Sequence, residues 1–189
     1  MSQDDWPNGE YFSWFENQEK FATVSGVTKE DRLATRMSQA IPPETQTVRL
    51  RIATSGPGDL GDFPTTGIRF PKILSERAFT LLRPMLLANG LTRDADIGGE
   101  RYHLFWPTSV SDCLDYEASK IKRAPTGYER LLVPAFQVGG VESRSVFVTR
   151  QFPDLVFVGR EFLSIITENG LKGFCTWPDM GDDESLICV

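Results

Sequence analysis

The sequence contains few of the residues that most often carry catalysis or bind metal ions. Its 189 residues include one histidine, His103, and three cysteines, Cys113, Cys175 and Cys188. The cysteines are odd in number and far apart, so we expect ordinary thiols rather than a disulfide framework or a CxxC metal site. A single histidine needs partners to act as a ligand or a base. We therefore expect no metal, no cofactor and no catalytic role for His103.

Long apolar runs and clustered basic residues are also scarce. No run approaches the roughly 20 apolar residues that a membrane-spanning helix needs, and residues 1–10 lack the basic and apolar regions of a secretory signal. We therefore expect a cytoplasmic protein. The formal net charge of −6 argues against an extended nucleic-acid contact, because phosphate binding depends on clustered Lys and Arg. The same acidity is common in proteins without any charged partner.

The stretch 146–174 carries the clearest succession of structural signals. Residues 146–148 and 155–158 are β-branched and aromatic, which predicts two buried strands. Apolar residues at helical spacing follow Gly159, and Asn169-Gly170 predicts a left-handed helix end before the chain returns toward the sheet. No nucleophile, base or metal ligand stands out in this stretch, which we interpret as scaffold.

Residues 71–90 repeat this order of signals. A short apolar run precedes Ser75 as a helix cap, and a helical run ends at Asn89-Gly90. The repeat fits either an internal duplication or the convergence of two short strand–helix units. Pro84 should kink or shorten this helix, because proline lacks a backbone donor and clashes with the preceding turn.

Weaker patterns predict the remaining elements. Residues 28–40 predict an amphipathic helix capped by Thr28 and Asp31, with Leu33, Met37 and Ala40 on its apolar face. Residues 47–53 and 101–106 alternate like strands, and Pro134 limits a strand at 131–136. On the first strand Val48, Leu50 and Ile52 share one face, and on the second Tyr102, Leu104 and Trp106 share one face.

Residues 55–67 are rich in glycine and proline but lack the lysine of a phosphate-binding loop, so they predict a long surface loop. Together the patterns predict a single α+β domain with a mixed or mainly antiparallel sheet and a few short helices. Residues 1–66 form an N-terminal segment packed on the main domain, residues 67–178 form the core, and residues 179–189 form an acidic tail.

One cluster of carboxylates keeps an enzymatic alternative open. Asp112, Asp115 and Glu117 precede three basic residues, so a solvated or salt-bridged segment is one interpretation. Together with Tyr128 or His103 the same carboxylates could perform acid–base chemistry, provided that a pocket gathers them.

Two segments are candidates for binding a partner. The aromatic N-terminal segment fits either an interaction surface or rings that cover an edge of the core; its candidate contact residues are Trp6, Tyr11 and Trp14. The tail fits either capture of a basic partner surface or a solvated segment; its acidic residues are Asp179, Asp182, Asp183 and Glu184.

Four passages in order resemble family eleven of the bacterial polymorphic-toxin immunity proteins, long catalogued as a domain of unknown function. The passages are PKILSERAFTLL, VSDCLDYEASKIK, VFVTR and LVFVGREFLSIITENGLKGF, within residues 71–174. The strongest points are the Asp112, Asp115, Glu117, Ser119 pattern and the turn 170–173 that leads into Phe174.

The resemblance implies an α+β protein encoded beside a toxin gene, used in competition between bacteria that deliver toxin effectors by secretion systems. Such a protein is not an enzyme: it neutralises its toxin by stoichiometric binding, and we expect that toxin to have a basic active-site cleft. The alternatives are a small hydrolase or transferase that uses Asp112, Asp115 and Glu117, or an adaptor module without a toxin.

Overall fold

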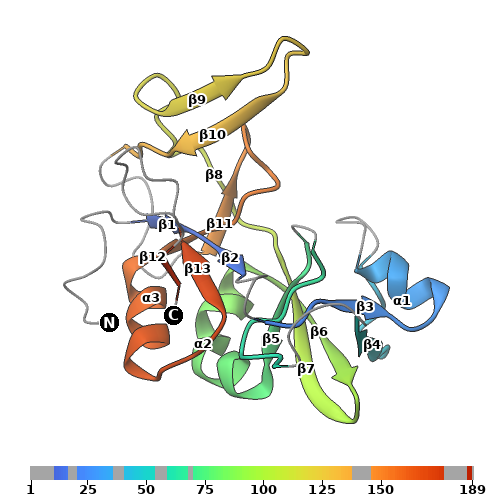
Figure 1. The fold of residues 1–189 in the computed structure, drawn as a ribbon. Coiled ribbons are helices and arrows are strands. Elements are labelled where there is room, and N and C mark those ends of the chain that lie inside the picture. The colour runs from blue at the N-terminus through green and yellow to red at the C-terminus, as the bar shows by residue number, and fades with distance from the viewer. Residues whose placement is uncertain are drawn as a thin grey trace.

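The computed structural model describes residues 11–16, 21–35, 41–53, 59–67, 70–137, 146–176 and 187–188. They form a single α+β domain with mixed sheets and short helices, as predicted (Figure 1). No helix in these ranges is long and apolar enough to cross a membrane. The helices are α1 (Lys29–Ala34), α2 (Glu76–Asn89) and α3 (Arg160–Glu168). The strands are β1 (Tyr11–Ser13), β2 (Phe15–Glu16), β3 (Val24–Gly26), β4 (Val48–Ile52), β5 (Lys72–Ser75), β6 (Gly90–Ile97), β7 (Glu100–Pro107), β8 (Val110–Ser111), β9 (Lys120–Arg123), β10 (Glu129–Val133), β11 (Val146–Thr149), β12 (Phe157–Gly159), β13 (Phe174–Thr176) and β14 (Ile187–Cys188).

The largest sheet has the strand order β3-β4-β6-β7-β5. β4 runs parallel to β6, and the other neighbouring strands are antiparallel. β7 alternates as predicted: Tyr102, Leu104 and Trp106 join one hydrophobic cluster, while Phe105 joins a second cluster that includes residues of α2. Both faces of β7 are thus covered, which explains its nearly continuous apolar sequence.

The N-terminal strands are part of the sheets rather than a layer packed against them. β1 pairs with β12 in the sheet β1-β12-β11-β8, and β2 pairs with β13 in the sheet β14-β13-β2. β3 and β4 form one side of the largest sheet. The described residues before position 66 are therefore integral to the domain.

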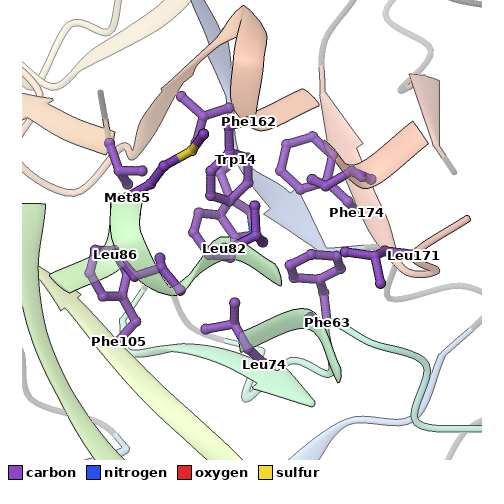
Figure 2. Packing of buried hydrophobic residues seen from close by; sticks show 14 of the residues in the cluster. Trp14, Phe63, Leu74, Leu82, Met85, Leu86, Phe105, Phe162, Leu171 and Phe174 are labelled. Carbon is purple, nitrogen blue, oxygen red and sulfur yellow. The ribbon is translucent and has the colours of Figure 1, made fainter. Parts of the chain in front are cut away.

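Trp14 lies at the centre of the main hydrophobic core, with 1% of its surface exposed. Its ring centroid is 5.2 Å from that of Phe162, 5.7 Å from Phe63, 6.0 Å from Phe174 and 6.2 Å from Phe105. Figure 2 shows these rings together with apolar side chains of α2. Burying a phenylalanine side chain contributes roughly 1.5–3 kcal/mol, so segments from the whole length of the chain stabilise this core together.

α3 ends in the left-handed turn that the sequence predicts. Gly170 has φ = +56°. Its N–H donates to the carbonyl of Thr167 (3.1 Å), and the N–H of Leu171 donates to the carbonyl of Ile166 (3.0 Å). These two bonds form a Schellman motif. Leu171 and Ile166 are both fully buried in the main core, so the turn fixes the path from α3 into β13.

α2 differs from its prediction at two points. Ser75 caps it as expected, because its hydroxyl accepts the N–H of Ala78 (3.1 Å). The helix continues through Pro84 to Asn89, so the expected shortening is wrong. Gly90 has an extended backbone rather than a left-handed one. A Cβ atom there would lie 2.3 Å from the carbonyl oxygen of Trp106, so close packing requires this glycine.

The first helix is shorter than predicted. Thr28 and Asp31 form the predicted capping box: the Asp31 N–H donates to the Thr28 hydroxyl (3.1 Å), and the Thr28 N–H donates to the Asp31 carboxylate (3.0 Å). Leu33, expected on the apolar face, is exposed, while Ala34 is buried. Met37 and Ala40 lie outside the described residues. The buried residues of α1 are Asp31 and Ala34, and the Asp31 carboxylate also accepts the N–H of Arg49 on β4 (3.1 Å).

On β4, Val48 and Leu50 are buried as predicted, but Ile52 at the strand end is exposed. The described part of the expected surface loop, residues 59–67, enters the core. Phe63 is fully buried. One carboxylate oxygen of Asp62 accepts the Ser75 hydroxyl (2.7 Å) and the other accepts the N–H of Lys172 (2.9 Å). The prediction of a surface loop is wrong here, because Asp62 ties the segment to two distant elements.

The cysteines also differ from the prediction of free thiols. Cys175 on β13 is disulfide-bonded, and its backbone pairs in register with Cys188 on β14. Cys113 is a free, buried thiol, and burial raises its pKa above the ordinary value. Cys175 and Cys188 are brought into register by the pairing of β13 with β14. Because this pairing is a long-range feature, the spacing of the cysteines in the sequence did not predict the disulfide bond.

Candidate functional site

The groups of the enzymatic alternative have separate structural roles. Asp112 pairs with Arg150 (Oδ1–Nε 2.8 Å), and the Asp115 carboxylate accepts the N–H of Ala118 (3.0 Å). Glu117 is exposed. The salt bridge of Asp112 fits the alternative of a salt-bridged segment. No group of three or more His, Cys, Asp or Glu within the described ranges is arranged to hold a metal ion.

His103 lies on β7, with its ring held between other carboxylates. It is 3% exposed, and its Nε2 lies 2.7 Å from Glu76 Oε2 while its Nδ1 lies 3.3 Å from Asp94 Oδ1. The ring stacks on Phe79 at a centroid distance of 3.8 Å. The two contacts therefore link α2 and β6 to β7, which we call the His103 clamp. Neither ring nitrogen faces solvent, where it could act as a base.

A cleft of about 550 Å³ opens beside this clamp. Arg101 at its edge contacts both carboxylates, with Nη2 3.1 Å from Asp94 Oδ2 and Nε 3.4 Å from Glu76 Oε2. Arg93, also in its lining, donates to the carbonyl of Pro42 (2.6 Å). Two of the carboxylates in the lining, Glu76 and Asp94, are thus paired with Arg101 and contact His103. Arg83 lies in the same lining.

A second feature, the two-stranded ribbon β9–β10, projects from the body of the protein (Figure 1). We call residues 120–133 the hairpin. Its turn is closed by the Ala124 N–H donating to the carbonyl of Tyr128 (2.8 Å) and the Gly127 N–H donating to the carbonyl of Ala124 (2.9 Å). Tyr128 at this turn is 58% exposed. A large aromatic side chain is thereby presented at the end of a defined ribbon.

The hairpin is anchored by a polar network near its turn. Arg123 Nε lies 2.8 Å from Glu129 Oε1, and the Tyr116 hydroxyl donates to Glu129 Oε2 (2.6 Å). The hydrogen bond from Tyr116, followed by that from Arg123, holds the pKa of Glu129 below its ordinary value. Arg123 also donates to the Tyr116 hydroxyl (3.2 Å), and this bond, followed by the one to Glu129, raises the pKa of Arg123. On the ribbon itself, Leu131 is buried and Ile121 packs against the same cluster. The hairpin is therefore held by both polar and apolar contacts.

The residues predicted to bind a partner are not gathered into one surface. Tyr11 and Trp14 are buried in the hydrophobic clusters, so their rings cover the core instead of forming an exposed patch. Trp6 lies outside the described residues, as do the four acidic residues of the tail. The hairpin was not predicted from the sequence, because the basic residues after Glu117 were interpreted as counter-charges for the nearby carboxylates. The alternation of basic residues around a Pro-Thr-Gly turn was the signal available.

Comparison of the sequence with protein-family models and with curated proteins finds no match. The resemblance to the immunity family consequently stays a prediction that rests on the four passages.

Proposed function

We propose that the protein is a non-enzymatic immunity protein that neutralises a cognate toxin by one-to-one protein–protein contact. The observation that carries this proposal is the projecting hairpin with Tyr128 exposed at its turn. Tyrosine and arginine are enriched at the energetic centres of protein interfaces. A ribbon already fixed by Tyr116, Arg123 and Glu129 binds without a large cost for ordering the segment.

The position of the hairpin relative to the four resembling passages supports the proposal. These passages supply β5 and the first half of α2, β8 and most of β9, β11, and β12, α3 and the first residue of β13. The turn and the second strand of the hairpin fall between the second and third passages. A shared scaffold with an exposed contact element that lies partly outside it suits inhibitors that must each match a different partner.

The proposal includes a cytoplasmic location, where an inhibitor would meet a toxin delivered into the cell. Disulfides are rare in reducing compartments. The disulfide bond of Cys175 therefore counts against this part of the proposal. The proposal also includes a basic active-site cleft on the toxin, which the acidic residues 179–184 would approach.

The experiment is co-expression of the protein with the product of the neighbouring reading frame. We expect that product alone to stop growth, and we expect protection to saturate at one inhibitor per toxin in titrations of the purified proteins. A neighbouring product without toxicity, or one that the protein does not bind, would contradict the proposal.

A variant separates this function from the enzymatic alternative. Asp112→Asn, Asp115→Asn and Glu117→Gln together remove the three carboxylates with little change in shape. We expect the triple variant to bind and protect like the unmodified protein. Loss of protection in a triple variant that still folds and binds would favour an enzyme.

A further inference from the structure

The lining of the cleft beside the His103 clamp changes in character from one end to the other. α2 packs across β6 and β7 (Figure 1). It contributes Glu76, Phe79, Arg83 and Leu87 to the lining, at the three- and four-residue spacings of one helix face. Because β6 follows α2 directly, the last turn of the helix lies beside the start of β6, where Leu91 also lines the cleft. The cleft is therefore polar near the first turn of α2 and apolar near its last turn.

The apolar end of the cleft is open to solvent. Leu87 is 49% exposed and Leu91 is 40% exposed, although both line a concave surface that encloses about 550 Å³. Clefts of this size, with apolar walls and a small number of polar groups, are typical binding sites for small molecules. An apolar group of a ligand would cover the two leucines and remove their surface from water.

The polar end of the cleft already holds its own counter-charges. Arg101 and His103 each contact both Glu76 and Asp94. These two carboxylates are therefore engaged at the end of the cleft where α2 begins. Arg93, a further arginine of the lining, donates hydrogen bonds to two backbone carbonyl groups. Two of the arginines in the lining thus have partners within the chain.

Arg83 has no such partner. Its exposed side chain forms no ion pair or hydrogen bond within the part of the chain that the structure describes. The residues three and four positions away on α2 carry no charge; they are Phe79, Thr80, Leu86 and Leu87. An arginine can bind a carboxylate through two parallel hydrogen bonds. Leu87 lies one helical turn further on, about 6 Å along the axis, so one small molecule can contact both side chains.

The other charges of the lining favour a ligand with a single negative charge. A third carboxylate, Glu44, lies 4.0 Å from Arg93. A phosphate group or a nucleotide would bring two or more negative charges into a lining that already holds three carboxylates, and like charges repel. One carboxylate balances the one charge of Arg83 and leaves the remaining ion pairs undisturbed.

We infer that the cleft between α2 and β6 binds a small monocarboxylic acid with an apolar chain. The carboxylate of the ligand pairs with Arg83, and the chain covers Leu87 and Leu91. The His103 clamp forms the opposite, polar end of the site and keeps α2 in place against the sheet. The inference goes beyond the proposed function and does not depend on it, because it involves neither a toxin nor the hairpin.

The test is an NMR titration of the isotope-labelled full chain with hexanoate. We expect saturable shifts of the amide signals of residues 83–92. Hexanoate should bind about 10-fold or more tightly than acetate, which lacks the apolar chain. Hexanol has the chain without the charge, and we expect it to bind about 10-fold more weakly than hexanoate. Hexyl phosphate has the same chain with a larger negative charge and should also bind more weakly than hexanoate.

Variants assign the binding to the two kinds of contact. Arg83→Gln removes the charge with little change in size, and we expect about 10-fold weaker binding of hexanoate. The matched control is Arg51→Gln, which removes an exposed arginine of β4 outside the lining and should leave the affinity unchanged. Arg83→Lys should retain more affinity than Arg83→Gln. Leu87→Ala should narrow the difference between hexanoate and acetate, because it shortens the apolar wall.

Four results would overturn the inference. They are equal affinities of Arg83→Gln and Arg51→Gln for hexanoate, equal binding of hexanol and hexanoate, tighter binding of hexyl phosphate than of hexanoate, and shifts confined to residues outside the lining. If Arg83→Gln fails to fold, the comparison of hexanoate with hexanol and hexyl phosphate on the unmodified chain still decides the question.

Discussion

Lys122 and Arg130 lie directly opposite each other on β9 and β10, whereas the next pair toward the turn, Arg123 and Glu129, is joined by an ion pair. Two adjacent pairs on one ribbon thus have opposite electrostatic effects. The ion pair is the one of the two that stabilises the ribbon.

The first prediction concerns this contrast. Lys122→Glu places opposite charges at the like-charged pair, and we expect it to stabilise the hairpin by about 0.2–1 kcal/mol. Amide hydrogen exchange of residues 120–133 measures this effect. Lys122→Gln serves as the control, with a smaller change. A variant that is less stable than the unmodified chain would contradict the assignment of the pair.

The second prediction concerns a buried ion pair. Lys72 Nζ lies 2.9 Å from Glu16 Oε1, with the two side chains 4% and 8% exposed, and it also donates to the Trp14 carbonyl (3.0 Å). We expect Lys72→Met to destabilise the protein by about 3–5 kcal/mol, because it leaves a buried carboxylate without a partner. Lys72→Met combined with Glu16→Met should recover most of that loss in urea unfolding. A double variant no more stable than the single one would contradict the pairing.

The same pair gives a pH dependence. Burial raises the pKa of Glu16 above its ordinary value and outweighs the opposing effect of Lys72. A raised pKa in the folded state means that the folded protein binds the proton more tightly than the unfolded chain. The stability from this group is therefore full below the usual glutamate pKa of about 4.3 and is lost as the pH rises through the folded pKa. We expect this decline to be absent in Glu16→Gln, and an unchanged pH profile would contradict the account.

The third prediction concerns the end of α3. Gly170→Val should destabilise the protein by roughly 1 kcal/mol or more, because a β-branched residue is poorly tolerated at positive φ. No atom lies within 4 Å of a Cβ built at Gly170, so the cost comes from the backbone. Gly170→Asn should cost less, since asparagine tolerates the left-handed region. Equal unfolding free energies for the two variants would show that the backbone conformation is not the cause.

The fourth prediction concerns the cysteines. With Cys175 in a disulfide and Cys113 free, the denatured, unreduced chain should react with one equivalent of a thiol reagent, and the reduced chain with three. For this thiol count the chain is expressed in the cytoplasm of a host cell and is purified under conditions that block thiol exchange. Three reactive thiols before reduction would show that the disulfide does not form in that compartment.

Local patterns in the sequence predicted local structure well. The left-handed Gly170, the capping box of Thr28 with Asp31, and the shared face of Tyr102, Leu104 and Trp106 each depend on residues within a few positions of one another. Such features follow from backbone preference and side-chain alternation alone. The α+β class followed from the same signals.

Features that depend on distant residues were missed. Asp62 bonds to Ser75 and to Lys172, and no periodicity in a loop indicates such partners. His103 was weighed with the carboxylates near it in sequence, but its carboxylate partners come from α2 and β6. The hairpin was missed for a related reason, because pairing across a turn decides which charges face each other.

The central claim is that the hairpin is the surface by which the protein holds its partner. Hydrogen exchange followed by mass spectrometry, on the full chain with and without the product of the neighbouring reading frame, tests this most directly. The account predicts that the complex slows exchange in residues 120–133 more than in any other segment, and that Tyr128→Ala reduces this protection. Protection confined to other segments, such as those around the His103 clamp, with unchanged exchange in the hairpin, would contradict it.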